Sequence, residues 1–221
     1  MNWGRIPSGN IWTNEVVFIV GGGSSLIGVD IPAITNGHVT IAVNQSALRL
    51  RCPTAVSVDH QFMDRRAAEL EALTKTTNVY LCPPTHKQIC EPLQKKIPSA
   101  HFFRENTKGF SWCPESLHRI GGSSGYGALN VATLMGAKRI ILLGFDYCRN
   151  HRGVKNWHEA YTWPQNENWT AWARAYVNAA PSLVEHGVEV INASPISAIT
   201  AFPRMTVTEA LNWRWGESRA A

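Results

Sequence analysis

The chain has 221 residues, enough for one large domain with a buried core and only marginally enough for two. Hydrophobic residues make up 44% of the sequence and charged residues 17%, which excludes the disordered and fibrous classes. With 21 Lys and Arg against 16 Asp and Glu, the net charge is +5. This charge suits an anionic partner such as a nucleotide, an acidic sugar or nucleic acid, and its sign alone does not choose among them. From the length, a single domain over 1–221 is predicted.

Targeting and redox signals are weak throughout. No apolar run approaches the roughly 20 residues that span a bilayer, and the N-terminus lacks the apolar stretch of a signal peptide, so a cytoplasmic location is predicted. The five cysteines form no CxxC pair, and reduced thiols are expected. Two groups of cysteine and histidine have spacings that match no usual zinc module. They are Cys82, His86 and Cys90, and Cys148, His151 and His158.

Short β-branched and aromatic runs in the first half of the chain predict the strands of a parallel sheet. Several of these runs end in a polar residue, and parallel sheets place ligand contacts at the carboxyl ends of their strands. A helix from Gln61 to Leu73 supplies one crossover. The predicted strands are Val16–Val20, Thr40–Asn44, Thr54–Asp59, Asn78–Cys82 and His101–Phe103.

The second half continues the alternation of helices and strands. A mostly apolar helix over Tyr126–Met135 precedes a buried strand, Arg139–Asp146. The stretch Tyr147–Asn166 is too long and too rich in functional side chains for a simple connector, and we predict a lid there. A helix spans about 168–186, and Pro181 within it predicts a kink or a break.

A last strand at Val188–Asn192 and a short helix at Val207–Trp213 complete the predicted elements. The alternation of strands and helices throughout the chain is typical of an open sheet with crossover helices. The predicted fold is therefore a doubly wound, mostly parallel Rossmann-like α/β sheet with helices on both faces.

Two Gly/Ser clusters follow strands and precede helices, an arrangement that aims backbone N–H groups at an anion. The first cluster contributes Gly21, Gly23, Ser24 and Ser25 as predicted donor-binding residues, and Gly121–Gly125 contributes Ser123, Ser124 and Gly125. Leu26 and Ile27 interrupt the dinucleotide spacing GxGxxG, and no Walker motif is present. The alternative for each cluster is a tight turn that requires positive φ.

Polar residues close three of the predicted strands. Asn44 and Asp59 are candidates for hydrogen bonds to a base, ribose or donor sugar, and the alternative is that each caps the following helix. Asp146 is a candidate for binding ribose or a metal. Because no DxD pair is present for a divalent ion, we predict that no metal is required.

The predicted lid carries the candidates for proton transfer. Histidine is the usual group for activating a hydroxyl, and His158 is the predicted base. Lys155 and Tyr161 are of the types that steady a leaving phosphate, and Tyr161 is the second predicted catalytic residue. The alternative for His158 is a surface or structural histidine.

Several motifs, in order and spacing, resemble the bacterial lipooligosaccharide sialyltransferase family. They are Gly21-Gly22-Gly23-Ser24-Ser25-Leu26, Val43-Asn44-Gln45, Ser123-Ser124-Gly125-Tyr126, the run from Gly136 to Tyr147, and Asn192-Ala193-Ser194-Pro195-Ile196-Ser197. The chain is also similar to uncharacterised phage and bacterial proteins related to those transferases. A more distant likeness is to archaeal hydroxymethyl-dihydropterin diphosphokinases.

The resemblance implies a Rossmann-like transferase that uses a CMP-linked donor without an essential metal or other cofactor. It places Asn44, Ser124 and Gly125 at the donor's sugar and phosphate, and Gly144 and Phe145 by the base. The chain departs from the family in two places. Gly22 replaces an asparagine of the first turn, and 163–165 reads Trp-Pro-Gln where the family has its catalytic histidine.

We therefore predict transfer of a group, most simply a sugar, from a nucleotide donor to an acceptor left open among glycan, small molecule and nucleic acid. Diphosphate transfer from ATP is one alternative. Another is a phage-type DNA-binding or nucleic-acid-modifying protein, suggested by the basic balance and the tryptophans of the second half. Self-association through those tryptophans is also open.

Overall fold

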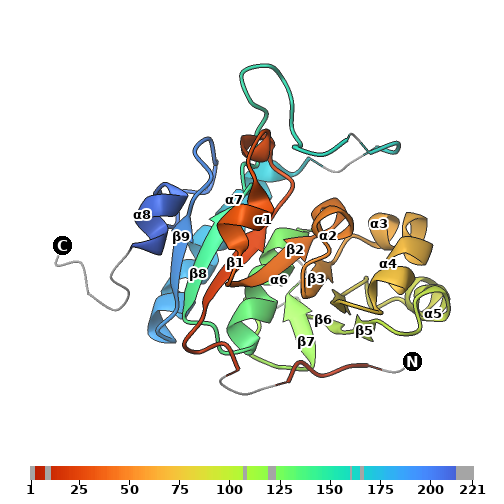
Figure 1. Cartoon of the computed structure of the whole chain (residues 1–221). Coiled ribbons are helices and arrows are strands. Elements are labelled where there is room, and N and C mark those ends of the chain that lie inside the picture. Colours follow the sequence, from red (N-terminus) through yellow and green to blue (C-terminus); the bar gives the residue numbers. More distant parts are fainter. Residues whose placement is uncertain are drawn as a thin grey trace.

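Seven strands form one fully parallel sheet at the centre of the molecule (Figure 1). The computed structural model describes residues 3–7, 11–106, 109–118, 123–159, 161–164 and 167–212. The strand order is β5-β4-β3-β2-β1-β8-β9, and β6 and β7 form a separate parallel pair. The strands are β1 Val16–Val20, β2 Val39–Val43, β3 Thr54–Ser57, β4 Asn78–Leu81, β5 His101–Phe102, β6 Arg104–Asn106, β7 Ser116–His118, β8 Arg139–Leu143 and β9 Glu189–Asn192.

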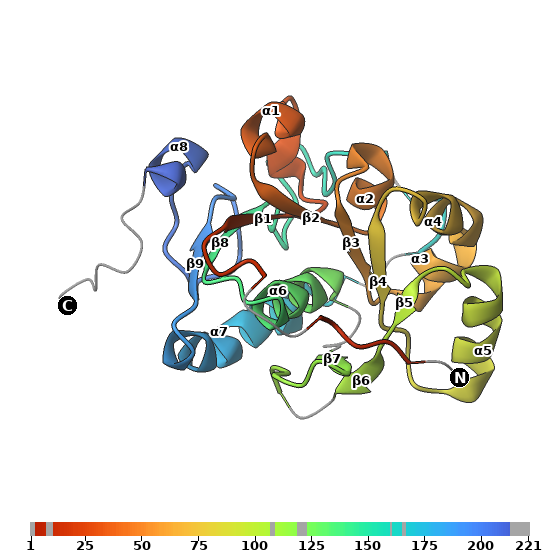
Figure 2. The same ribbon diagram turned by 60° about the horizontal axis from the view of Figure 1, so that its bottom comes forward.

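Helices cover both faces of the sheet (Figure 2). α6 and α7 lie on one face, and α1 and α2 lie on the other. The helices are α1 Ile31–Thr35, α2 Gln45–Leu50, α3 His60–Arg65, α4 Ala67–Leu73, α5 Lys87–Lys96, α6 Ser124–Leu134, α7 Trp169–Glu185 and α8 Val207–Leu211. The doubly wound, mostly parallel Rossmann-like fold predicted from the sequence is confirmed.

Strand side chains alternate between the two layers, as the two-residue period of a strand requires. In β1, Val17 and Ile19 belong to the core beneath α6 and α7, whereas Phe18 and Val20 belong to the core on the opposite face. All four side chains are fully buried. Burial on both faces explains why these strands read as unbroken apolar runs.

Strand ends and helix breaks differ in detail from the prediction. The polar residues Asn44 and Asp59 lie just beyond β2 and β3, where the backbone turns toward the following helix. The predicted helix from Gln61 to Leu73 divides at Arg66 into α3 and α4. No residue ranges were predicted for helices α1, α2 and α5.

Of the two outcomes predicted at Pro181, the break is wrong, because α7 runs unbroken from Trp169 to Glu185, and the kink stays a prediction. Pro181 lacks an N–H and leaves the carbonyl four residues earlier, at Val177, without its helical partner. Pro181 is exposed and Val177 is 46% exposed, so this gap in the helical hydrogen bonding falls on a solvent-exposed part of α7. Trp213, the end of the predicted terminal helix, lies outside the described residues, as do Gly121, Gly122 and residues 160, 165 and 166 of the predicted lid.

The strand order reverses beside β1, which has β2 on one side and β8 on the other. In open α/β sheets such a reversal opens a crevice at the carboxyl ends of the strands. The cysteines are free thiols, as expected. In the described part of the chain, no helix combines the length and the apolar character needed to cross a bilayer.

Candidate functional site

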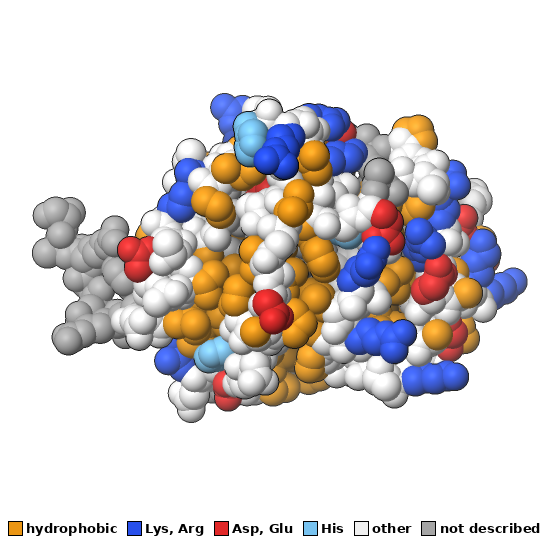
Figure 3. Space-filling view, turned by 45° about the horizontal axis from the view of Figure 1, so that its top comes forward, with side chains coloured by type: hydrophobic (Ala, Val, Ile, Leu, Met, Phe, Trp, Pro, Cys, Tyr) orange, Lys and Arg blue, Asp and Glu red, His pale blue; other side chains and the backbone are white. Residues whose placement is uncertain are grey.

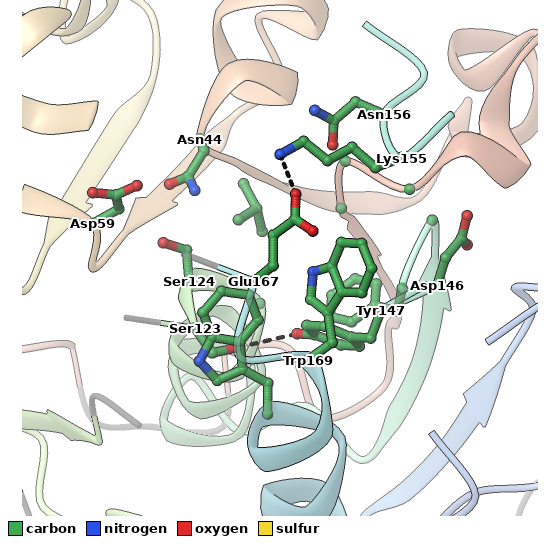
Figure 4. Close-up of a pocket in the computed structure, with 18 of the residues that line it drawn as sticks. Asn44, Asp59, Ser123, Ser124, Asp146, Tyr147, Lys155, Asn156, Glu167 and Trp169 are labelled. Carbon is green, nitrogen blue, oxygen red and sulfur yellow. Dashed lines mark hydrogen bonds and ion pairs between the residues drawn. The ribbon is translucent and has the colours of Figure 1, made fainter. Parts of the chain in front are cut away.

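A cavity of about 470 Å³ lies at the carboxyl ends of β1, β2, β3 and β8 (Figure 4). Its walls come from the turn after β1, the first residues of α6, the segment after β8 and the start of α7. Of the sequence-predicted site residues, two do not reach this wall: Ser24 and Ser25. The others line it: Gly21, Gly23, Asn44, Asp59, Ser123, Ser124, Gly125, Gly144, Phe145, Asp146, His158 and Tyr161.

The backbone of the first glycine turn is hydrogen-bonded within the chain. Gly21 N donates to Leu143 O at 2.8 Å, and Gly23 N donates to Gly144 O at the same distance. A Cβ at Gly23 would stand 2.4 Å from Asp146 Cγ, so only glycine fits there. The turn therefore joins β1 to the end of β8, and two of its N–H groups are already engaged.

Ser24 and Ser25 bind a carboxylate of the chain itself. Ser25 donates its N–H to Asp146 Oδ2 at 2.8 Å and its hydroxyl to Oδ1 at 2.5 Å, and the Ser24 hydroxyl adds a bond of 3.3 Å to Oδ2. Burial raises the pKa of Asp146, while these serine hydrogen bonds lower it. The hydrogen-bond acceptor that fills this turn is thus Asp146, 1% exposed, and the prediction that Ser24 and Ser25 contact a donor finds no support in this geometry.

The second glycine and serine cluster opens α6, whose 11 residues direct a positive dipole end at the cavity. The Ser123 hydroxyl caps the helix by accepting from Tyr126 N, and it hydrogen-bonds Tyr147 Oη at 3.0 Å. The Ser124 hydroxyl accepts from Val58 N at 2.9 Å. A Cβ at Gly125 would stand 2.6 Å from Phe145 Cε1, so glycine allows Phe145 to pack here.

Asn44 combines backbone strain with an unpaired polar atom. Its φ of 51° and ψ of −123° place it in a region that glycine tolerates and other residues rarely adopt. Among the described residues, its buried Oδ1 has no hydrogen-bond partner. Strain and unpaired polar atoms cluster at binding sites because the surrounding fold must enforce them. Asn44 is the strongest geometric indication of a ligand in this cavity.

Asp59 has a demonstrable structural role. Its Oδ1 accepts from Gln61 N at 2.9 Å and from Phe62 N at 3.2 Å, and thereby caps α3. This is the alternative that the sequence allowed for it. Asp59 also lines the cavity, so its carboxylate belongs to the wall as well as to the helix cap.

His158 stands against the first glycine turn. A Cβ at Gly22 would lie 3.1 Å from His158 Nε2, so the absent side chain leaves room for the ring. Nδ1 donates to Glu159 O at 2.9 Å, which leaves Nε2 as the proton acceptor. Burial and the nearby Arg49 lower the pKa of His158 to about 4. The imidazole is therefore neutral at pH 7.

Tyr161 supports the histidine ring. Its ring meets His158 edge-on with centroids 5.4 Å apart, and it packs against Trp163 at 4.9 Å. Burial raises the pKa of Tyr161 well above its usual range, so the hydroxyl stays protonated. Tyr161 is thus placed to orient His158 and to donate a hydrogen bond.

The segment that carries His158 is tied to the first turn. Asn156 forms an antiparallel bridge with Gly23, and Ser24 N donates to Lys155 O at 3.1 Å. The Trp157 indole donates to Gly21 O at 3.2 Å. This half of the predicted lid is therefore anchored over the cavity by backbone pairing.

Several wall residues were missed by the sequence reasoning. Glu167 pairs with Lys155 across the cavity at 2.9 Å (Figure 4). Asn156 Nδ2 and Trp172 Nε1 are buried and lack partners among the described residues. Among the wall residues that the structure describes, the charged side chains are one ammonium, Lys155, and three carboxylates, those of Asp59, Asp146 and Glu167. Across the described residues, no three His, Cys, Asp or Glu side chains gather as a metal site, and this includes the described members of the two cysteine and histidine groups.

Comparisons with known proteins show the fold. No protein-family model matches the chain, and no curated protein matches it. Solved structures do match: 97% of the chain superposes on 36% of MAf glycosyltransferase from Magnetospirillum magneticum AMB-1, with a TM-score of 0.63 and 14% identity. The sialyltransferase CstII from Campylobacter jejuni, in complex with cytidine-5'-monophosphate, matches 87% of the chain over 85% of its own, with a TM-score of 0.50 and 14% identity.

The chain thus corresponds to about a third of the length of the Magnetospirillum protein. At 14% identity, these likenesses establish a shared fold. This Rossmann-like α/β fold is one that glycosyltransferases use, and the resemblance seen in the sequence is supported at that level.

Proposed function

We propose that the protein is a glycosyltransferase-like enzyme that transfers a sugar from a nucleotide donor, with a CMP-linked donor favoured. The observation that carries the proposal is the cavity at the strand ends, whose wall includes both the strained Asn44 and the neutral His158. Ligand pockets of α/β sheets lie at this position, and about 470 Å³ accommodates a nucleotide. The shared fold with CstII, which is seen in complex with CMP, supports the choice of nucleotide.

The charges of the wall favour a donor with one phosphate. Lys155 is the one ammonium among the described wall residues, and three carboxylates share the wall with it. The phosphate that links a sugar to a nucleoside monophosphate carries a single negative charge, which Lys155 and the N-terminus of α6 balance without a metal ion. A diphosphate donor brings a second negative charge that these groups leave uncompensated.

The reaction needs one proton acceptor. In the proposed step, an acceptor hydroxyl attacks the anomeric carbon, the bond from that carbon to the phosphate oxygen breaks, and the hydroxyl proton passes to His158 Nε2. The nucleotide departs as the phosphate anion. Tyr161 holds the imidazole edge-on, and the hydrogen bond from Nδ1 to Glu159 O keeps Nε2 available.

Nucleotide binding is the direct test. Thermal unfolding is followed with CMP, UMP, UDP, ADP and ATP, each with Mg²⁺ or with EDTA. We expect CMP to raise the melting temperature most, equally in EDTA, because a ligand that binds only the folded state stabilises it. Stabilisation by ATP alone, with Mg²⁺ required, supports diphosphate transfer instead. Absence of a shift with every nucleotide contradicts the proposal.

The nucleic-acid alternative has weaker support from the surface. Figure 3 shows Lys and Arg side chains interspersed with Asp and Glu on the right-hand half of that face, rather than gathered in one basic stripe. A nucleic-acid footprint of several phosphate contacts produces a steep fall of affinity with salt. Retention on DNA no stronger than that of a neutral control protein removes this alternative.

A further inference from the structure

Glu167 reaches into the donor cavity from the residues just before α7. Its carboxylate lies 2.9 Å from Lys155 Nζ, and Figure 4 shows the two side chains meeting among the wall residues. Their side chains are 34% and 24% exposed. A carboxylate therefore binds the one ammonium that the described wall offers to a phosphate.

The backbone of Lys155 is held in place by hydrogen bonds, so its ammonium group can reach only a limited part of the cavity. Ser24 N donates to Lys155 O at 3.1 Å, and the neighbouring Asn156 pairs with Gly23. Within the described residues, the hydrogen-bond partner of its ammonium is Glu167. The four-carbon side chain can thus exchange one anion for another at the cavity without moving the chain around it.

Arg149 holds Glu167 independently of Lys155. Its Nη2 donates to both carboxylate oxygens, at 2.8 and 3.0 Å. The guanidinium also donates to Gly153 O at 3.1 Å and lies 5.7 Å from the Trp169 ring. Glu167 therefore keeps a cationic partner when Lys155 leaves it.

We propose that Glu167 is an internal competitor for the ligand's phosphate: a phosphate-bearing ligand takes Lys155 from Glu167, and Arg149 retains the Glu167 carboxylate. The inference rests on the proposed nucleotide site and identifies what sets its affinity. Glu167 lowers affinity in two ways. Its pair with Lys155 must be broken on binding, and its negative charge then faces the phosphate.

A double-mutant cycle tests this exchange. Dissociation constants of CMP are measured by calorimetry for the wild type, Glu167→Gln, Lys155→Met and the double variant. We expect Glu167→Gln to bind CMP about three- to tenfold more tightly, since partly exposed ion pairs contribute modestly. In the Lys155→Met background the same substitution should have a clearly smaller effect, because the pair to be broken is already gone.

Matched controls separate local from general charge effects. Glu185→Gln removes the same charge from the exposed far end of α7 and should leave CMP binding unchanged. Cytidine lacks the phosphate, so Glu167→Gln should change its affinity less than twofold. Equal or weaker CMP binding by Glu167→Gln overturns the inference, as does an undiminished effect in the Lys155→Met background.

Inorganic phosphate distinguishes this inference from the proposed function. If CMP binds neither protein while phosphate binds Glu167→Gln more tightly than the wild type, the exchange stands and the nucleotide proposal fails. If CMP binds both proteins equally, the nucleotide proposal stands and the exchange fails. No binding of either probe to any variant overturns both.

Discussion

The two glycine and serine turns look alike in sequence and behave differently in the structure. At Gly21–Ser25, the backbone N–H groups of Gly23 and Ser25 donate to Gly144 O and to the Asp146 carboxylate. At Ser123–Gly125, the chain enters α6 and directs the start of an 11-residue helix at the cavity. The first turn is therefore a structural joint between strands, and the second is the better candidate for binding an anion.

The difference shows that whether a glycine turn can bind an anion depends on which acceptors its backbone N–H groups already donate to. A cluster predicts free donors only when no acceptor of the protein reaches them. Asp146 lies 121 residues from Ser25 in sequence, so no local pattern reveals that it fills the first turn. In the proposed mechanism, the first turn contributes through His158, which occupies the space beside Gly22.

Replacing His158 by glutamine gives the largest expected effect on the reaction rate. It tests the proposed role of the histidine that packs beside the first turn. If Nε2 accepts the proton of the acceptor hydroxyl, the turnover of a CMP-linked sugar should fall about 100- to 10,000-fold. The measurement is the rate of CMP release at saturating donor. His151→Gln, an exposed residue of the same segment outside the cavity wall, should change this rate little. A loss below about tenfold in His158→Gln contradicts the assignment.

The dependence of the reaction rate on pH tests the same role of His158 as a proton acceptor. Because the folded-state pKa of His158 is about 4, below the usual 6.5, the ring is neutral between these values and remains able to accept a proton. The acid limb of kcat/KM, which reports the free enzyme, should therefore lie near pH 4. The acid limb of kcat should lie at higher pH, because the bound phosphate favours the protonated ring.

Gly23→Ala and Gly22→Ala form a matched pair within the first turn. A Cβ at Gly23 collides with Asp146 Cγ at 2.4 Å and with backbone at Gly144, so unfolding in urea should show a loss of about 3 kcal/mol. A Cβ at Gly22 meets only the His158 ring, at 3.1 Å, with Asn156 and other atoms at 3.7 Å or beyond. A loss below about 1 kcal/mol is expected there, with slower turnover. Equal losses in both variants contradict a structural role specific to Gly23.

The sequence predicted much of the fold because the central strands are long apolar runs buried on both faces. Val16–Val20 and Arg139–Leu143 are examples, and glycine or polar residues mark where each strand ends. The short helices α1 and α2 have too few residues to show a helical period, and α5 begins without a side-chain cap. Pro181 does not end α7, although the residue type favours a helix break, and it lies on an exposed part of that helix.

The site was predictable only in part. Asn44 and Asp59 were predicted because they are polar residues at strand ends, and His158 was predicted because it lies in the polar segment after β8. All three line the cavity. The pairing of Glu167 with Lys155 depends on the path of the segment between them, and the strain at Asn44 depends on the turn into α2. Neither the ion pair nor the backbone strain can be predicted from the pattern of residue types along the sequence.

The smallest expected effect concerns Asn44, whose strain separates binding from stability. Glycine adopts φ 51° and ψ −123° without steric cost, so Asn44→Gly removes both the strain and the unpaired Oδ1. Loss of the amide should weaken CMP binding about tenfold, since one ligand hydrogen bond contributes about 1–1.5 kcal/mol. The free energy of unfolding should rise by up to about 1 kcal/mol, because relief of strain exceeds the added entropy of the unfolded chain.

Arg51→Gly is the matched control for Asn44→Gly. Arg51 also has positive φ, 50°, but it is exposed at the end of α2 and does not line the cavity. Its replacement should give a similar change in stability and leave the CMP dissociation constant unchanged. If Asn44→Gly lowers stability and leaves binding intact, Asn44 serves the fold, and the cavity loses its strongest geometric indication of a ligand. If binding weakens while stability rises, the strain at Asn44 is maintained for the ligand.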